Sequence, residues 1–292
     1  MKESLEKQIY DAWHPSKFST RYDLYDTINK VSRLKGYWDK EEPIKLSPLN
    51  IEIAMNNRAE VLNLIRTGAN VNKVNEAGFT PLIEAVLLNN YEISKLLLEN
   101  GANVNGTENF IPLLIAAHYR NDLMIELLLN YGADAKVTDK NGFNALHHMF
   151  YDTKIQNLVS PIPPIIYSQL DFACNLFRVP DTEQTIKCID LLVEHGLDVN
   201  YSTQAELDFN SEQQTIDLNP LSLVMENFND EVITKLIELG SERKVVELSP
   251  HDSQIKYSKR IDYLRKIEKY NIEVYSGSLE DEYKRPKLIK RY

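Results

Sequence analysis

The sequence predicts an all-α solenoid of about five helix–turn–helix repeats, with a helical cap at each end and one long insertion. Two observations lead to this prediction. Three stretches of 26 residues, which begin at Ser47, Thr80 and Ile111, align with one another without a gap. In each stretch the apolar residues recur at helical spacing and give one strongly apolar face. A single unit of this kind cannot bury that face, so neighbouring units are expected to stack.

The composition is that of a globular protein and excludes several classes. Of the 292 residues, 43% are hydrophobic and 26% are charged, which is enough to build a sizeable core in one large domain or two smaller ones. The net charge of −10 opposes binding to nucleic acid or anionic membrane, so no nucleic acid partner is expected. Two cysteines, Cys174 and Cys188, are too few for a disulfide-stapled secreted scaffold or a multi-cysteine zinc site.

No targeting or membrane segment is predicted. No stretch approaches the roughly 18 uninterrupted apolar residues of a membrane span. Residues 1–13 contain five charged side chains and lack the apolar core of a secretory signal peptide. We therefore expect a soluble, intracellular protein.

The first element is an N-terminal helical cap over residues 1–45. Leu5, Ile9 and Trp13 form one helical stripe. A second stripe of Leu24, Ile28 and Val31 follows in the same segment. A terminal repeat exposes an apolar face unless another element covers it, and these two helices would do so.

Each repeat is predicted to contain two helices and a glycine stop. Pro81 and Pro112 suit the first turn of a helix, where a missing N–H has no effect on hydrogen bonding. A first helix then has Leu82, Ala85 and Val86 at helical spacing, and a second has Ile93, Leu96 and Leu97 on one face. The glycines after the second helices are expected to adopt a left-handed cap, and they are Gly68, Gly101 and Gly132.

Two further repeats are interrupted by added residues. Gly132 and Gly196 lie 64 residues apart, which is one 33-residue period plus 31 residues. The fourth repeat is therefore split by an insertion at about 150–182, which three prolines mark as partly non-helical. Gly196 and Gly240 lie 44 residues apart, so a second insertion falls in the polar stretch 201–216 before the fifth repeat.

The three aligned stretches resemble ankyrin repeats, whose signature is a period near 33 residues with Thr-Pro-Leu-His-x-Ala opening the first helix. Thr-Pro-Leu stands at Thr80, and Gly-Ala-Asn-Val-Asn closes the repeats at Asn72 and Asn105. The resemblance implies that residues 46–241 form the repeats and that they bind a protein partner in a concave groove, without catalysis. It covers most of the chain but implies no particular partner.

Residues after the repeats are expected to form a second cap and a charged tail. A helical cap is predicted over 242–279, from Tyr257, Ile261 and Leu264 at helical spacing. The tail, 280–292, has a basic cluster that could be a nuclear-import signal or a contact to an anionic surface; the alternative is a solvated charged tail. The basic residues are Lys284, Arg285, Lys287, Lys290 and Arg291.

The resemblance also implies where a partner would bind, because family members contact partners through hairpin tips and first helices. Phe79, Phe110 and Phe143 occupy equivalent positions, and if solvent-facing they would form an aromatic row of interface anchors. The alternative is that each ring packs on its own hairpin and helix. Residues on the nearby first helices and tips complete the candidate set, which also contains Glu76, Leu87, Leu88, His118, Tyr119, Lys140 and Asn141.

An enzyme is the alternative class, with an active site in the 150–182 insertion or the N-terminal region. His148, Asp171 and Cys174 could in principle make a nucleophile–base pair, although no motif supports it. His147 occupies the histidine position of the family motif, so we expect it to bond the neighbouring hairpin, and Cys188 is expected to be a buried small hydrophobe. Phosphate-binding glycine loops, His-Glu-x-x-His and metal-ligand spacing are absent from the sequence, so no cofactor or metal is expected.

Two further expectations follow from resemblance. Asn72, Asn105 and Asn200 each end a string similar to the substrate pattern of the animal asparaginyl hydroxylase; the alternative is that they simply bond the next hairpin. The acidic run Glu280–Glu282 resembles secretion signals of bacterial type IV effectors, many of which have ankyrin repeats. A virulence effector secreted by a bacterium into the host cytosol or nucleus is therefore the biological setting that we expect.

Overall fold

The structure is a computed structural model that describes residues 47–75, 78–150, 182–209, 212–227, 230–246 and 265–275. It falls into two compact units. The described residues up to Pro112 belong to unit 1, and those from Leu113 onward belong to unit 2. The predicted N-terminal cap, nearly all of the 150–182 insertion and the charged tail lie outside the described residues.

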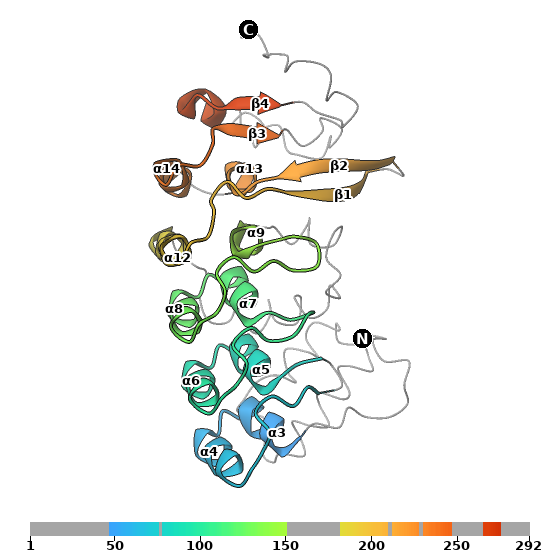
Figure 1. The fold of residues 1–292 in the computed structure, drawn as a ribbon. Helices are drawn as coiled ribbons and strands as arrows, with labels where there is room; N and C mark the ends of the chain where they lie inside the picture. Colours follow the sequence, from blue (N-terminus) through green and yellow to red (C-terminus); the bar gives the residue numbers. More distant parts are fainter. Residues whose placement is uncertain are drawn as a thin grey trace, which may run out of the picture. The chain divides into compact units, whose positions relative to one another are not determined.

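Unit 1 contains two stacked helix pairs. First helices pack on each other and second helices pack on each other, so each pair lies beside the next (Figure 1). This is the stacking of amphipathic units that the repeat pattern predicts. The helices are α3 (Pro48–Ala54), α4 (Arg58–Arg66), α5 (Pro81–Leu87) and α6 (Tyr91–Glu99).

Local signals set the ends of these helices. The Thr80 hydroxyl accepts a hydrogen bond from the Ile83 N–H at 3.2 Å, and Pro81 follows at the first helical position. The glycines after the second helices have positive φ angles of 96° at Gly68 and 84° at Gly101, as the predicted left-handed caps require. The stripe predicted for the second helix is confirmed, because Ile93, Leu96 and Leu97 are at most 4% exposed.

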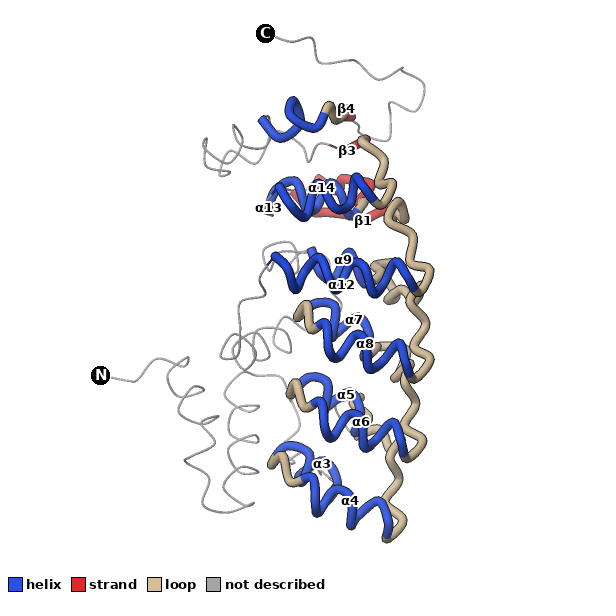
Figure 2. The backbone as a smooth tube through the Cα atoms, turned by 90° about the vertical axis from the view of Figure 1, so that its left-hand side faces the viewer, coloured by secondary structure: helices blue, strands red, loops and turns tan. Residues whose placement is uncertain are grey.

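Unit 2 contains the split fourth repeat. Helix α12 packs on α8 and α14, whereas α9 packs on α13. The helix before the insertion thus holds the first-helix position and the helix after it holds the second, as the glycine spacing predicts. The helices are α7 (Pro112–His118), α8 (Asp122–Asn130), α9 (Ala145–Phe150), α12 (Thr182–Glu194), α13 (Pro220–Asn227) and α14 (Asp230–Glu238). Figure 2 shows that the longer loops between successive helix pairs gather along one side of the helices within each unit, whereas the short turns inside the pairs lie on the other side.

The repeats are helical as predicted, but the additions to them include strands. The polar stretch 201–216 is not a simple loop: β1 (Thr203–Phe209) and β2 (Glu212–Leu218) form an antiparallel hairpin, paired from Thr203 with Leu218 to Phe209 with Glu212. Alternation of apolar and polar residues along β1 was the overlooked signal for a strand.

The region predicted as a second helical cap is mixed. β3 (Lys244–Val246) and β4 (Glu273–Tyr275) pair in parallel, and residues 265–270 are helical. The stripe predicted at Tyr257, Ile261 and Leu264 lies outside the described residues.

Candidate protein-binding surface

The turn at 139–143 is the most extensively hydrogen-bonded part of the predicted surface in unit 2. The Asp139 N–H donates to the Phe143 carbonyl oxygen at 3.0 Å, and the Gly142 N–H donates to the Asp139 carbonyl oxygen at 2.9 Å. One Asp139 carboxylate oxygen also accepts from the backbone N–H groups of Asn141 and Phe143, both at 2.9 Å. These bonds fix the turn backbone before any partner binds.

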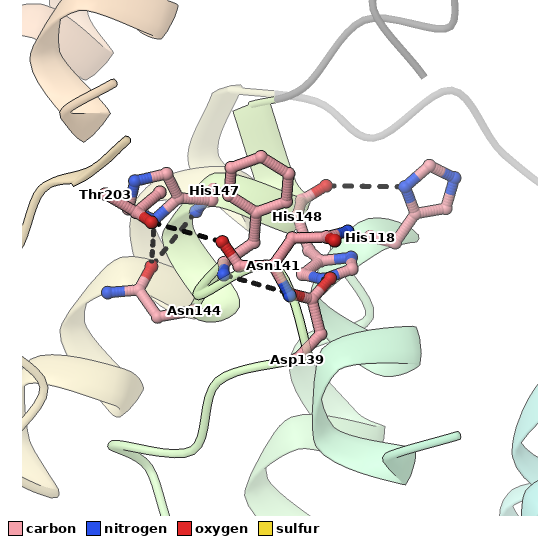
Figure 3. A network of polar contacts seen from close by, with 8 residues as sticks. His118, Asp139, Asn141, Asn144, His147, His148 and Thr203 are labelled. Atoms are coloured by element: carbon pink, nitrogen blue, oxygen red, sulfur yellow. Dashed lines mark hydrogen bonds and ion pairs between the residues drawn. The ribbon is translucent and has the colours of Figure 1, made fainter. Parts of the chain in front are cut away.

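A histidine on α9 holds the other carboxylate oxygen of this aspartate. His148 Nε2 lies 3.1 Å from Asp139 Oδ2, and the two side chains are 11% and 16% exposed (Figure 3). Burial alone would raise the pKa of Asp139, but the hydrogen bond and charge of His148, with the two backbone donors, hold that pKa below its usual value. The turn is therefore anchored to its own first helix by an ionised carboxylate.

His147 has the structural role expected of it. Its Nε2 donates to the Leu218 carbonyl oxygen at 3.0 Å. Its Nδ1 lies 2.6 Å from the side-chain oxygen of Asn144 (Figure 3). The ring is fully buried, which lowers the pKa of His147 to about 4 against the opposing effect of the Leu218 bond. His147 is neutral at pH 7 and links α9 to the end of β2.

The predicted aromatic row is corrected by the structure. Phe110 is 9% exposed and Phe143 is 5% exposed, so neither ring offers a solvent-facing anchor. Phe79 is partly exposed and packs edge-to-face on Phe110 with ring centroids 4.6 Å apart. Phe143 stacks on His147 at 5.6 Å. Phe143 therefore packs on its own first helix, as the alternative states, whereas Phe110 is buried against Phe79 of the preceding hairpin.

The adjacent leucines also differ from the predicted apolar patch. Leu87 is 5% exposed and belongs to the core, because it lies on the buried face of α5. Leu88 is partly exposed at the helix end. Glu76 lies outside the described residues.

His118 and Tyr119 lie at the end of α7 and are partly exposed. His118 Nδ1 donates to the His148 carbonyl oxygen at 3.3 Å, and its ring packs edge-to-face on Tyr119 at 4.9 Å. Arg120, which the sequence reading missed, donates from Nε to the Met149 carbonyl oxygen at 3.1 Å. These two donors satisfy carbonyl groups at the end of α9 that the helix itself leaves unpaired.

The turn tip is the accessible part of this surface. Lys140 is exposed and Asn141 is partly exposed. The Asn141 carbonyl oxygen accepts from the Thr203 hydroxyl at 3.1 Å, so the base of the β1–β2 hairpin braces the turn. No feature of the sequence marked Thr203, because the hairpin that positions it was not predicted.

The predicted hydroxylation residues include two that bridge neighbouring hairpins. Asn72 donates to the Gly101 carbonyl oxygen at 2.9 Å and accepts from the Asn103 N–H at 2.7 Å. Asn200 repeats this arrangement with Gly240 at 2.9 Å and Glu242 at 2.6 Å. Asn105 is exposed. The bridging interpretation is confirmed for Asn72 and Asn200, and hydroxylation stays a prediction.

In unit 1 a polar link joins the first helices. The buried Asn50 amide donates to the Glu84 carboxylate, and desolvation raises the pKa of Glu84 to about 7 despite that bond. Glu84 is itself partly exposed. No equivalent of the Asp139–His148 pair is available here, because Asn75 and Glu84 occupy the corresponding positions.

The residues of the alternative nucleophile–base pair are not brought together by the described structure. Asp171 and Cys174 lie outside the described residues. Cys188 is fully buried as predicted, and burial raises the pKa of its thiol to about 12, which keeps it un-ionised at pH 7. Within the described ranges no cluster of His, Cys, Asp and Glu could hold a metal ion. None of the described helices is both long and apolar enough to cross a bilayer.

Comparison with known proteins matches the repeats to a family. A model of three ankyrin repeats matches residues 26–108, and a model of one ankyrin repeat matches residues 108–140. The first match begins inside the segment predicted as the N-terminal cap. Both matches end before the insertion, so the fourth and fifth repeats rest on the helix packing of unit 2.

Several curated relatives share these repeats. An ankyrin repeat protein of Borreliella burgdorferi is 28% identical over 165 residues, which cover 54% of this chain and 74% of that protein. The ankyrin repeat and SAM domain-containing protein 6 of Rattus norvegicus is 26% identical over 56% of this chain and 21% of its own length. The E3 ubiquitin-protein ligase KEG of Arabidopsis thaliana is 29% identical over 38% of this chain and 6% of its own length. With the stacked helix pairs, these matches show that the chain contains ankyrin repeats, which the family models match over residues 26–140.

Proposed function

We propose that this chain is a non-catalytic protein-binding module whose partner contacts the turn face of unit 2. We define this turn face as His118, Tyr119, Lys140 and Asn141. Ankyrin repeats are generally protein–protein interaction modules. The observation that supports this particular face is the turn at 139–143, whose backbone is fixed by Asp139, His148 and Thr203 while Lys140 remains exposed.

A fixed turn favours binding because its conformational entropy is already lost in the free protein. Each side chain that must be ordered on association costs roughly 0.5–1.5 kcal/mol. The turn face presents one exposed charged side chain, Lys140, on an ordered backbone, together with the partly exposed rings of His118 and Tyr119. We infer that affinity comes from His118 and Tyr119, and that Lys140 adds specificity for an acidic partner surface.

The enzyme names of some relatives do not support enzyme activity in this chain. The palmitoyltransferase AKR1 of Lachancea kluyveri is matched over 13% of its own length, and the ubiquitin ligase KEG over 6%. Such short matches cover ankyrin repeats, so the chemistry in those names is a property of the larger proteins.

Quantitative affinity capture from a eukaryotic lysate tests the proposal. We expect Lys140→Glu combined with Tyr119→Ala to lose a protein that the wild type retains. The matched control is Lys95→Glu, which reverses an exposed lysine on α6 and should keep the same protein. A triple alanine variant of Phe79, Phe110 and Phe143 is unsuitable as a test, because Phe110 and Phe143 are buried and their loss would empty part of the core.

Circular dichroism must show that each variant is folded. A partner retained equally by all variants would place the interface outside the turn face. If Lys95→Glu also loses the partner, partner binding depends on the net charge of the chain and not on the turn face. Loss of activity on a substrate in Cys174→Ala, with partner retention unchanged, would support the enzyme alternative.

We also propose, as a narrower setting, that the chain is a bacterial effector that acts in a host cell. The support is the acidic run Glu280–Glu282 and the basic cluster after it. Relatives occur in bacteria, a poxvirus, a plant and a mammal, so the comparisons do not favour one setting. A translocation reporter fused to the chain, with Glu280–Glu282 replaced by Ala as the control, tests it by transfer into host cells.

A further inference from the structure

We propose that the helical residues 265–270 are the second helix of a sixth ankyrin repeat, which stacks on the fifth repeat. Figure 1 shows this helix beside α14, in line with α12 and α14. The repeat spacing agrees, because Asn271 lies 31 residues after Gly240, the same interval as that from Gly101 to Gly132. The family models match only residues 26–140 and do not reach this segment.

The helix ends in the same left-handed cap as α14. In both, the N–H of the cap residue donates to the carbonyl oxygen three residues before it, and the next N–H donates to the carbonyl oxygen five residues before the latter. These distances are 3.0 and 2.9 Å at Gly240, and 3.3 and 3.0 Å at Asn271. The φ angle is 91° at Gly240 and 53° at Asn271, and asparagine is the residue that most often replaces glycine in this cap. The residue after the cap, Ser241 or Ile272, is 6% exposed in both cases.

The hairpin after this helix is joined to the preceding hairpin at the expected positions. After α12, the Asn200 side chain bonds Gly240 and Glu242 of the next hairpin. Asn200 lies four residues after its cap glycine, and Glu242 lies two residues after the next cap glycine. At these same two positions in the following pair of hairpins, Lys244 and Glu273 are partners in the parallel β3–β4 ladder. Backbone pairing has therefore taken the place of the asparagine bridge, in the register of stacked repeats.

Ion pairs between successive second helices of unit 2 follow one rule, and the helix 265–270 obeys it. Each pair joins an aspartate on the earlier helix to a lysine on the later one. The pairs are Asp122 with Lys187 at 2.7 Å, Asp190 with Lys235 at 2.6 Å, and Asp230 with Lys269. The Tyr270 hydroxyl also donates to the Asp230 carbonyl oxygen at 3.1 Å, so two adjacent residues of the helix hold the start of α14.

A sixth repeat gives α14 a second helix on each side, α12 and the helix 265–270. Neighbouring units stabilise one another in a repeat array, so loosening the helix 265–270 should also loosen α14. The inference does not depend on the turn face, because it concerns other residues and holds whether or not a partner binds there.

Amide hydrogen exchange on the full chain tests the proposal through the cap. We expect Asn271→Gly to raise the protection of the helix 265–270 about 3-fold, because glycine adopts a left-handed conformation without strain. The matched control is Glu268→Gly, which places a glycine at an exposed position inside the same helix. It should lower protection about 3-fold, since glycine is unfavourable in a helix interior. Protection of α14 should follow in both variants.

A charge-reversal cycle tests the link to the fifth repeat. Asp230→Lys and Lys269→Asp should each lower the protection of the helix 265–270 about 2-fold, as expected for an exposed ion pair. The combined variant should lose less than the product of the two single losses, because the attraction is restored with the signs exchanged. The control Glu231→Lys makes the same charge change one residue further along α14 and should leave the helix 265–270 unchanged.

Three results would overturn the proposal. Lower protection in Asn271→Gly than in the wild type would show that the helix does not end in a left-handed cap. Protection of α14 that is the same in the wild type and in both glycine variants would show that the helix 265–270 does not stack on the fifth repeat. Losses that multiply fully in the combined charge variant would show that Asp230 and Lys269 do not join the two helices.

Discussion

The turn that joins Asn75 to Phe79 in unit 1 and the turn at 139–143 in unit 2 share two backbone hydrogen bonds but differ in side-chain chemistry. In both, a side-chain oxygen of the first residue accepts from the N–H of the last, at 3.0 Å for Asn75 and 2.9 Å for Asp139. Asn75 is neutral, whereas Asp139 is paired with His148. At the position of His148, unit 1 has Glu84, which bonds Asn50 on the preceding first helix. The repeat fold thus fixes hydrogen-bond geometry and leaves the charge free to vary.

The largest expected difference between the units comes from their cores. Leu97 on α6 and Leu236 on α14 are both fully buried on second helices. Changing either to Ala should lower the free energy of unfolding by about 2–5 kcal/mol, because each change leaves a cavity. Hydrogen exchange during urea titration should show the greater loss in unit 1 for Leu97→Ala and in unit 2 for Leu236→Ala. Equal losses in both units for both variants would show that they unfold as one body.

The next effect is an opposite response to pH. Burial lowers the pKa of His147 to about 4, so unfolded chains bind more protons between pH 4 and 6.5, and unit 2 loses stability as pH falls through that window. Desolvation raises the pKa of Glu84 to about 7, so the folded state holds the extra proton between pH 4.5 and 7, and unit 1 loses stability as pH rises. Each of these two pKa shifts should change the free energy of unfolding of its unit by roughly 2–3 kcal/mol across its pH window.

Unfolding followed unit by unit at pH 4.5, 5.5, 6.5 and 7.5 measures this difference. Glu84→Gln should flatten the response of unit 1 and leave that of unit 2 unchanged. Parallel pH profiles in the two units of the wild type would contradict the assignment of these two groups.

A smaller effect separates charge from hydrogen bonding in the turns. Asp139→Ala should destabilise unit 2 by about 2–3 kcal/mol, because two partly buried N–H groups and His148 lose their partner. Asp139→Asn keeps a side-chain oxygen that accepts hydrogen bonds, as Asn75 does in unit 1. We therefore expect it to lower the free energy of unfolding of unit 2 by only about 1 kcal/mol. Asn75→Ala should cost about 1–2 kcal/mol in unit 1.

Acid titration of these turn variants adds a sign test. The pKa of Asp139 is held low, so its contribution exists above the unfolded pKa near 3.9 and disappears as pH falls through the lower folded value. Below that range Asp139→Asn should match the wild type. If Asp139→Asn still lowers the stability of unit 2 below that pH range, the loss does not come from the carboxylate charge.

The smallest effect concerns ion pairs on the second helices. Arg58 and Glu92 in unit 1 lie 4.0 Å apart and are mostly exposed, so Arg58→Ala should not change the unfolding midpoint measurably. In unit 2, Asp122 is 15% exposed and accepts from Lys187 and Gln184 at 2.7 and 2.9 Å, which joins α8 to α12. Asp122→Asn should lower the midpoint of unit 2. If Arg58→Ala lowered the unfolding midpoint more than Asp122→Asn does, burial would not determine how much these ion pairs contribute to stability.

Residue spacing was sufficient to predict the scaffold, because helices and glycine stops are set by local chemistry. Pro81, the stripe through Ile93 and Leu97, and the positive φ at Gly101 follow from short stretches of chain. Exposure of Phe110 and Phe143 was not predictable in this way, since it depends on how a hairpin packs against its neighbours. Thr203 was missed for a related reason: it matters only because the β1–β2 hairpin returns to the turn at Asn141.

The split fourth repeat implies that backbone continuity is not what joins its helices. Helix α9 is held chiefly by α13, and α12 chiefly by α8 and α14, so the partners of each lie in neighbouring repeats. If the chain were cut between residues 150 and 182, α9 and its partner α13 would lie on different fragments, and so would α12 and its partner α8. Each fragment would then contain helices that pack on helices of the other. Co-expressed fragments 1–150 and 182–292 should then assemble by complementation, which would make the insertion a natural site for a split reporter or an inserted domain.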